Sequence, residues 1–321
     1  MGKHLTPEIM VIGSINMDLV VRVPHFPAAG ETIAGTQFQM IPGGKGANQA
    51  VAASRLGSRV AMIGRVGQDL FGQVLLEGLN SQGVDTQEVR RDEEANTGIA
   101  MIMVDPSGEN RIVIAAGANG QVSKADVEAA QECISRSSIL ITQFEIPLPV
   151  VEYALAVARR HGVTTILNAA PGYQVSIDLL EKVDYLVLNE GECHILTGIE
   201  VGDASSAQAA ARHLLKRGPR KVIVTLGEKG ALLAEDGLEI GYKAPPVAVV
   251  DTTAAGDAFI GGLAVALLQG FVAADALYYA ICAGSLAVTK FGAQSSLPSA
   301  AEVHELYRSE RPSTWIVSKG T

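Results

Sequence analysis

The sequence contains few cysteines, and they are not spaced as disulfide or zinc ligands usually are. Its 321 residues include only Cys133, Cys193 and Cys282, an odd and widely scattered set. None of the six histidines belongs to an H-E-x-x-H motif, which excludes the commonest zinc-protease pattern. The cysteine usage excludes a disulfide framework and favours a reducing compartment, so we expect a cytoplasmic protein.

A long basic stripe and a long apolar run are also missing. The formal net charge is −9 at pH 7, which argues against nucleic acid as a partner because phosphate binding requires clustered lysine and arginine. The longest apolar run, from Ala258 to Leu268, is too short to cross a bilayer. We therefore expect small-molecule chemistry, without nucleic acid or membrane partners.

What is present suits a large α/β protein. Hydrophobic residues make up 48% of the chain, glycine is abundant at 34 residues, and aromatic residues are only 5%. A chain of this length buries a sizeable core, as one large domain or two smaller ones. Many glycines and few aromatics favour strand–helix turns over an all-β architecture.

Apolar strand-like runs alternate with amphipathic helix-like runs along most of the chain. The predicted strands are Glu8–Ile15, Arg59–Gly64, Ser138–Thr142, Thr164–Leu167, Tyr185–Leu188 and Val222–Leu226. The predicted helices are Gly46–Leu56, Ser123–Ser135, Pro147–His161, Ser205–Arg217, Ala254–Leu268 and Ala273–Thr289. This alternation predicts an α/β fold with a mostly parallel sheet flanked by helices on both faces.

Two pairs of strand-like segments lack an intervening helix. They are Leu19–Val23 with Thr32–Met40, and Gly98–Val104 with Arg111–Ile114. We expect these lid strands, inserted at about 19–40 and 97–115, to form a small separate sheet that covers a site. The alternative is an extra hairpin at the edge of the main sheet. The remainder, 8–308, is predicted to be one domain, and 310–321 a flexible tail.

The turn Asp251–Asp257 is the most informative stretch of the chain. Its small residues allow a ligand to approach the backbone. We expect the amides of Ala255, Gly256 and Asp257 to be unpaired at a helix N-terminus, which makes an anion site. Asp257 is then either a helix-capping residue or a general base for an attacking hydroxyl, and the turn alone does not decide between them.

Two further stretches offer polar groups without a known nucleotide motif. The run Gly43–Ala50 leads into a helix, but it matches neither the P-loop nor G-x-G-x-x-G. It is either a glycine-rich turn or a polyol site in which Asn48 meets hydroxyls, with Lys45 at the rim. Asn16 and Asp18 follow the first strand, where open α/β sheets bind ligands, and their amide and carboxylate suit sugar hydroxyls. The alternative is an ordinary Asx turn.

Taken together, these stretches resemble the ribokinase-like (PfkB) carbohydrate kinase family. Gly43–Asn48 is similar to the first family signature and Asp251–Phe259 to the second. Between them, Asn189–Glu192 matches an N-x-x-E element and Thr225–Gly230 a nucleotide-side turn. The resemblance runs from about Glu8 to Leu297, and two ordered signatures are far more specific than either alone.

The resemblance implies an enzyme that moves the terminal phosphoryl group of ATP to a sugar hydroxyl. Ala116–Asn119 and Gly292–Gln294 point, within the family, to members that act on D-ribose at its 5-hydroxyl and give ribose 5-phosphate. Deoxyribose, fructose or a nucleoside remain alternative acceptors. Asn16 favours ribose, because a sugar lacking the matching hydroxyl leaves a polar group unpaired. The family also implies a homodimer that forms through the lid sheets.

The family's functional residues have counterparts at the matching positions. The implied sugar pocket consists of Asn16, Asp18, Gly44, Lys45, Asn48, Glu145 and Asp257. Asp257 is the implied catalytic base, beside an anion hole made by Ala254, Ala255 and Gly256. The implied ATP contacts are Asn189, Thr225, Gly227, Gly230 and Gly256. Glu192 is implied to hold Mg²⁺ through water. A monovalent cation, usually K⁺, is implied at Asp251, Thr253, Ala287, Lys290, Gly292 and Ser296.

Two other functional classes are less well supported by the residues. A sugar-binding regulator that has lost catalysis would lack the base or the anion-hole glycine, whereas Asp257 and Gly256 are both present. A nicotinamide oxidoreductase requires G-x-G-x-x-G after the first strand, which Gly13–Asn16 does not supply. Ala254 replaces a glycine common in the family, a change that still allows amide donation.

Overall fold

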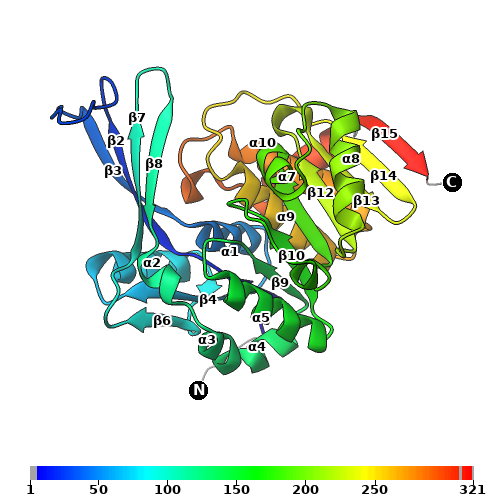
Figure 1. Ribbon diagram of the computed structural model, residues 1–321, viewed down its shortest axis with the longest axis horizontal. Helices are drawn as coiled ribbons and strands as arrows, with labels where there is room; N and C mark the ends of the chain where they lie inside the picture. The colour runs from blue at the N-terminus through cyan, green and yellow to red at the C-terminus, as the bar shows by residue number, and fades with distance from the viewer. Residues whose placement is uncertain (1–5, 311–312, 320–321) are drawn as a thin grey trace.

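The computed structural model describes residues 6–310 and 313–319. Within them, a large twisted sheet runs through the molecule and a small sheet projects from one side of it (Figure 1). The order of the large sheet is β15 (Thr314–Lys319), β14 (Leu238–Tyr242), β13 (Ala231–Glu235), β12 (Lys221–Thr225), β11 (Tyr185–Asn189), β10 (Thr164–Asn168), β9 (Ile139–Thr142), β1 (Ile9–Ile12), β4 (Val60–Gly67) and β5 (Val84–Asp85). A further strand, β6 (Val89–Asp92), pairs with β4.

The large sheet is mostly parallel, as the alternation of strands and helices predicts. All pairs from β4 across to β12 are parallel, whereas β13, β14 and β15 add three antiparallel strands at one end. Parallel neighbours need crossover connections, which the intervening helices provide. The carboxyl ends of the parallel strands consequently meet along one edge, where ligands bind in such folds.

Two hydrophobic cores fill the two faces of the large sheet. Successive side chains of β1 alternate between them: Ile9 and Val11 belong to one core, and Met10 and Ile12 to the other. The first core is covered by α1 (Lys45–Arg55), α2 (Leu70–Ser81), α9 (Ala255–Leu268), α10 (Ala273–Ala287) and α11 (Ala300–Ser309). The second is covered by α3 (Lys124–Ala129), α4 (Gln131–Arg136), α5 (Leu148–Arg160), α6 (Ile177–Leu180), α7 (Glu190–Thr197) and α8 (Ala204–Leu215). Among these helices, none combines the length and apolarity that a membrane span requires.

The small sheet has four strands and stands apart from the main body (Figure 1). Its order is β3 (Gln37–Gly43), β2 (Asn16–Arg22), β7 (Gly98–Val104) and β8 (Asn110–Ala115). This arrangement confirms the predicted separate sheet and excludes the edge hairpin. The predicted strand Thr32–Met40 begins too early, because pairing with β2 starts only at Gln37. We call this four-stranded sheet the lid.

Two predictions about single elements are wrong. The predicted helix Ser123–Ser135 is divided at Ala130, whose backbone leaves the helical geometry between α3 and α4. The predicted flexible tail includes the strand β15, which pairs with β14. Pairing satisfies backbone groups that β14 would otherwise leave open at the sheet edge, and Gly241 leaves space for the Trp315 ring, which a Cβ there would approach to 2.7 Å. Residues 311–312 and 320–321 of that tail lie outside the described residues.

Candidate active site

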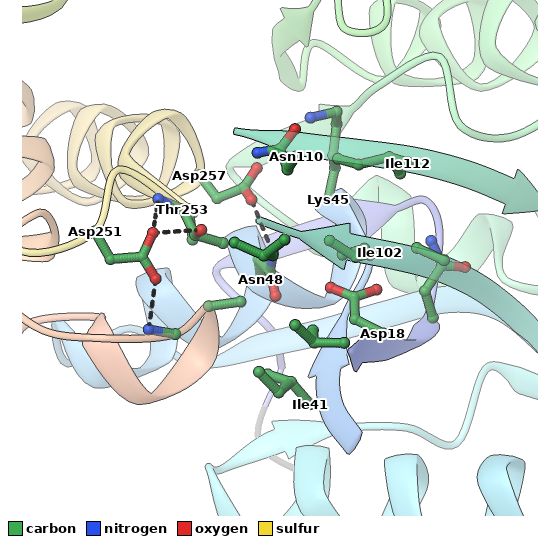
Figure 2. Close-up of a pocket in the computed structure, with 18 of the residues that line it drawn as sticks. Asp18, Ile41, Lys45, Asn48, Ile102, Asn110, Ile112, Asp251, Thr253 and Asp257 are labelled. Carbon is green, nitrogen blue, oxygen red and sulfur yellow. Dashed lines mark hydrogen bonds between the residues drawn. The ribbon is translucent and has the colours of Figure 1, made fainter. Parts of the chain in front are cut away.

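A cavity of about 630 Å³ lies between the lid and the carboxyl ends of the main-sheet strands. Alternate residues of the lid strands face it, including Asp18, Ile102 and Ile112, and α1 and α9 close it from the other side (Figure 2). Every residue of the predicted sugar pocket lines this cavity. They are Asn16, Asp18, Gly44, Lys45, Asn48, Glu145 and Asp257.

A tight approach between Gly44 and the first strand sets the start of α1. Gly44 has φ 88°, and a Cβ there would lie 2.8 Å from the backbone nitrogen of Asn16. A side chain at this position would be strained and would clash, so the chain requires glycine. Glu145 accepts hydrogen bonds from the Lys45 backbone nitrogen at 3.1 Å and from Ser14 Oγ at 2.5 Å. These bonds tie the start of α1 to the segment after β9.

Asp257 is buried near the start of α9 and holds two amide donors. Asn48 Nδ2 donates to its Oδ2 at 2.9 Å, and Gln49 Nε2 donates to its Oδ1 at 2.9 Å. The residue is only 6% exposed, and burial raises its pKa, while Lys45 and the two amides oppose the shift. The side chain contacts α1 rather than only capping its own helix, which makes the general-base interpretation chemically possible.

Gln49 is a site residue that the sequence reasoning missed. Besides Asp257 it donates to Asn168 Oδ1 at 3.1 Å, and it accepts from Gln143 Nε2 at 2.6 Å. Because an ionised carboxylate only accepts, the Gln49 nitrogen faces Asp257, and the Gln49 oxygen is left to accept from Gln143. The one sequence feature that could have indicated Gln49 is its position directly after Asn48 in the glycine-rich run. Its hydrogen-bond partner Gln143 lies more than ninety residues away in the sequence.

The cavity collects acidic groups around one lysine. Burial raises the pKa of Asp18 to about 7, and the neighbouring Glu145 and Asp257 carboxylates add to this shift. Burial alone would lower the pKa of Lys45, but the surrounding carboxylates, with Asp257 first among them, outweigh it and the pKa is raised. Lys45 thus stays protonated, and the group as a whole offers many acceptors to hydroxyl donors.

The turn predicted to form the anion hole has a geometry that differs from the prediction at one amide. Ala254 adopts φ 59°, and among the described residues it is the one non-glycine residue with positive φ. The Ala255 amide does not stay free as predicted, because it lies 3.3 Å from the Thr252 carbonyl in a turn. No hydrogen bond of the described residues uses the amides of Gly256 or Asp257. Two unpaired amides at the N-terminus of α9, with its dipole, suit an anion.

A second cavity of about 240 Å³ adjoins the first. It is lined by the predicted ATP residues Asn189, Thr225 and Gly256, and it shares Asp257 with the sugar-side cavity. Gly227 and Gly230 line neither cavity; they bound the short helix η2 (Gly227–Lys229) after β12.

The N-x-x-E element caps a helix beside both cavities. Asn189 Oδ1 accepts from the Glu192 backbone nitrogen at 2.9 Å, and Glu192 Oε2 accepts from the Asn189 backbone nitrogen at 2.8 Å. Glu192 lines both cavities, and burial raises its pKa. A single carboxylate at this position fits Mg²⁺, which usually keeps several waters and takes its other ligands from phosphates.

The predicted monovalent-cation ligands lie on two connected loops. Asp251 accepts from the Thr253 and Gly292 backbone amides, each at 2.9 Å, and these three residues line the larger cavity (Figure 2). Ala287, Lys290 and Ser296 line neither cavity. Lys290 directs its ammonium to Glu302 at 2.7 Å, which leaves only its carbonyl for a cation. The set contains oxygen ligands alone, the chemistry that alkali cations prefer.

The geometry agrees with comparisons to known proteins. A family model described as pfkB family carbohydrate kinase matches residues 6–300. Ribokinase of Haemophilus influenzae is 42% identical over 305 residues, which cover 95% of this chain and 98% of that protein. Ribokinase of Schizosaccharomyces pombe is 44% identical over 306 residues, 92% of this chain and 96% of that one.

Two further comparisons bear on the acceptor. Deoxyribokinase of Salmonella typhimurium is 38% identical over 299 residues, which cover 93% of this chain and 98% of that protein. A solved structure of Arabidopsis thaliana ribokinase complexed with ribose and ATP superposes with a TM-score of 0.88 at 33% identity, covering 95% of this chain and 99% of that one.

Proposed function

The chain belongs to the pfkB family of carbohydrate kinases, and from this premise we propose that it transfers the terminal phosphoryl group of ATP to the 5-hydroxyl of D-ribose. The product is ribose 5-phosphate. The choice of ribose rests on relatives named ribokinase at 42% and 44% identity, each aligned over more than nine-tenths of both chains. The Arabidopsis structure with ribose and ATP supports the same pair of substrates.

One observation carries the proposal: Asp257 lies where the two cavities meet. The larger cavity offers polar side chains for a sugar, and the smaller one offers the residues expected along ATP. Both are also lined by Lys45 and Glu192. A base at the junction is positioned to receive a proton from an acceptor hydroxyl while the phosphate approaches from the other side.

The transfer step follows from this arrangement. The sugar hydroxyl gives its proton to the Asp257 carboxylate, and its oxygen forms a bond to the terminal phosphorus. The bond from that phosphorus to the bridging oxygen breaks, and ADP leaves with the electron pair. The amides of Gly256 and Asp257 stabilise charge on the phosphoryl oxygens during transfer. A weak base suffices, because the transition state is loose and depends on positioning and charge.

Asn48, which lines the sugar-side cavity, carries an unsatisfied acceptor. Its Oδ1 is buried and lacks a hydrogen-bond partner among the described residues. An unpaired buried acceptor costs about 1–3 kcal/mol, which a sugar hydroxyl would recover if Asn48 turned this oxygen toward it on binding. Asp18, Lys45 and Glu145 supply further acceptors and a donor for the remaining hydroxyls.

The ligand atoms available at each position suggest where Mg²⁺ and K⁺ would bind. Glu192 would hold Mg²⁺ through water, and the ion would neutralise charge between the terminal phosphates of ATP. K⁺ would be held by the side chains of Asp251 and Ser296 and by the carbonyls of Thr253, Ala287, Lys290 and Gly292, steadying the anion-hole turn. Asn189, Thr225, Gly227 and Gly230 would lie along the nucleotide.

We also propose a cytoplasmic homodimer that forms through the lids. The free thiols Cys133, Cys193 and Cys282 suit a reducing compartment. The lid face opposite the cavity carries large exposed apolar residues, among them Phe38, Met40, Met101 and Val113. A face of this kind marks a protein contact more often than a solvated surface.

The test is ADP release with ATP, Mg²⁺ and K⁺ against ribose, 2-deoxyribose, fructose and adenosine, with Asp257→Asn measured in parallel. We expect ribose to be the preferred acceptor. The variant should lose about 100-fold or more in kcat, since general-base catalysis contributes 10²–10⁴-fold. Ribose binding, measured by calorimetry, should change little. Unimpaired turnover by Asp257→Asn would contradict the assigned base.

A second acceptor is favoured by one comparison. The deoxyribokinase relative is 38% identical over nearly the whole chain, only slightly less than the ribokinases. If 2-deoxyribose is turned over as efficiently as ribose, the fold and mechanism stand and the acceptor assignment moves to the deoxy sugar.

A further inference from the structure

A pair of buried asparagines lies behind the sugar pocket. Asn119 is 1% exposed and belongs to η1 (Gly117–Gln121), a short 3-10 helix after β8. Its Oδ1 accepts from the Ile15 backbone nitrogen at 2.8 Å. Its Nδ2 donates to the Ile15 carbonyl at 3.1 Å and to Asn16 Oδ1 at 2.7 Å. Asn119 therefore bridges the end of the first strand and a cavity residue.

The backbone of Ile15 determines the orientation of both amides. A backbone N–H only donates and a carbonyl only accepts, so the Asn119 oxygen and nitrogen cannot be exchanged without losing both bonds. With Nδ2 of Asn119 fixed as a donor, the Asn16 atom facing it must be Oδ1. The Nδ2 of Asn16 remains, and no hydrogen bond of the described residues engages it. Asn16 lines the larger cavity.

A glycine on the neighbouring strand makes room for this pair. In the lid, Asn16 of β2 is in register with Gly43 of β3 and with Gly98 of β7. A Cβ at Gly98 would lie 2.2 Å from Asn119 Nδ2 and 2.4 Å from Asn16 Oδ1. Any side chain at Gly98 would force the two amides apart.

We propose that Asn119 is a positioning residue that makes Asn16 a hydrogen-bond donor toward the sugar and thereby contributes to acceptor selectivity; this rests on the proposed ribose kinase function. Asp18 lies two residues along the same strand and also faces the cavity. A donor from Asn16 and an acceptor from Asp18 together match one hydroxyl, which has lone pairs to accept and a proton to give. If the Asn16 amide were turned round, its oxygen and the Asp18 carboxylate would both have to accept the single proton of that hydroxyl.

The test is Asn119→Asp, which keeps the size of the side chain but replaces its donor by an acceptor. The Asn16 amide is expected to rotate and donate to the new carboxylate, so that its oxygen faces the cavity. We expect KM for ribose to rise about 10-fold, as for a lost buried hydrogen bond, with KM for ATP unchanged. The preference for ribose over 2-deoxyribose, as a ratio of kcat/KM, should fall by a similar factor.

A double-mutant cycle with Asn16→Ala separates positioning from a general structural effect. If Asn119 acts through Asn16, Asn119→Asp should change ribose KM less than about 2-fold in the Asn16→Ala background, since residues in contact are coupled and the effect of one is lost when its partner is removed. An equal rise in both backgrounds would overturn the proposal. Asn80→Asp is the matched control, because Asn80 is exposed on α2 and its side chain bonds to Leu76 and Thr86, far from the cavity lining.

A measurement on the unmodified protein tests the proposal even if the variants misfold. The side-chain amide resonances of Asn16, assigned by their loss in Asn16→Ala, should shift on adding ribose. Unshifted resonances at saturating ribose would overturn the proposal. Absence of ribose turnover by the unmodified enzyme would instead contradict the proposed function, so the two failures are distinguishable.

Discussion

Gln49 is expected to control the ionisation of Asp257 as well as its position. Its amide donates to the charged carboxylate, which lowers the pKa that burial raises. Since the base acts only when ionised, activity falls as pH drops through its pKa. Gln49→Met removes a donor to the ion, so the pKa rises further and the acidic limb of the kcat/KM profile moves to higher pH.

The expected loss follows from the strength of such a bond. A hydrogen bond to a charged group contributes about 1.5–3 kcal/mol, so kcat/KM on the acidic side should fall about 10-fold or more. A pH series from 5 to 9 with saturating ATP measures it. Gln73→Met, at a glutamine bonded to Glu77 on α2, should leave the limb in place. If the acidic limb of the profile lies at the same pH in Gln49→Met as in the unmodified enzyme, Gln49 does not control the ionisation of Asp257.

For single residues, the sequence predicted which runs matter but not which side chains meet. Asp257 and Asn48 stand within the two signatures. Gln49 and Asn119 also stand in runs singled out above, but Gln49 contacts Gln143, 94 residues away, and Asn119 contacts Asn16 across 103 residues. A contact that arises only when separate strands meet leaves no local pattern in the sequence.

Among the elements, the turn before α9 stores backbone strain at the anion site. Ala254 has φ 59°, a conformation that costs a non-glycine residue about 1–3 kcal/mol. Ala254→Val should destabilise the protein by about that amount, because a branched side chain fits this region worse than alanine. Ala254→Gly should be neutral or slightly stabilising, as relief of strain offsets the added unfolded-state entropy.

Thermal unfolding of the two variants measures this effect. Ala204→Val, at the first residue of α8, is the control, since Ala204 starts a helix without positive φ. If Ala204→Val and Ala254→Val lower Tm equally, the loss reflects branching alone and not strain at the turn.

Long helices with continuous apolar sequences were predicted well, whereas a strand that forms only by pairing with a sheet edge was not. The helices Ala254–Leu268 and Ala273–Thr289 agree with α9 and α10 to within two residues at each end. By contrast, β15 lies in a segment predicted to be a flexible tail, although its sequence contains the apolar run Trp315–Val317, and it pairs with the open edge of β14. Edge pairing is a tertiary event, and three apolar residues close to Pro312 do not by themselves predict it.

For the whole molecule, the two faces of the lid differ in what they meet. One faces the cavity and combines Asp18 and Asn110 with apolar residues such as Ile102 and Ile112. On the other, a row of apolar residues runs straight across the sheet: Met40, Leu19, Met101 and Val113 are paired in register. Met101 is 56% exposed and Val113 63% exposed. Leu19 packs against the first core, whereas the described part of the chain leaves Met40, Met101 and Val113 exposed, which is why we place the proposed dimer contact at this face.

Met101→Lys places a charge in the centre of that row and should convert the proposed dimer to a monomer, because an unpaired charge is costly to bury at an interface. Val272→Lys is the matched control, at a residue 65% exposed at the N-terminus of α10. Sedimentation velocity distinguishes the two species. We expect ribose KM to rise in the monomer, since Met101 shares its strand with Ile102, which lines the cavity. A Met101→Lys protein that remains dimeric would show that the subunits meet elsewhere.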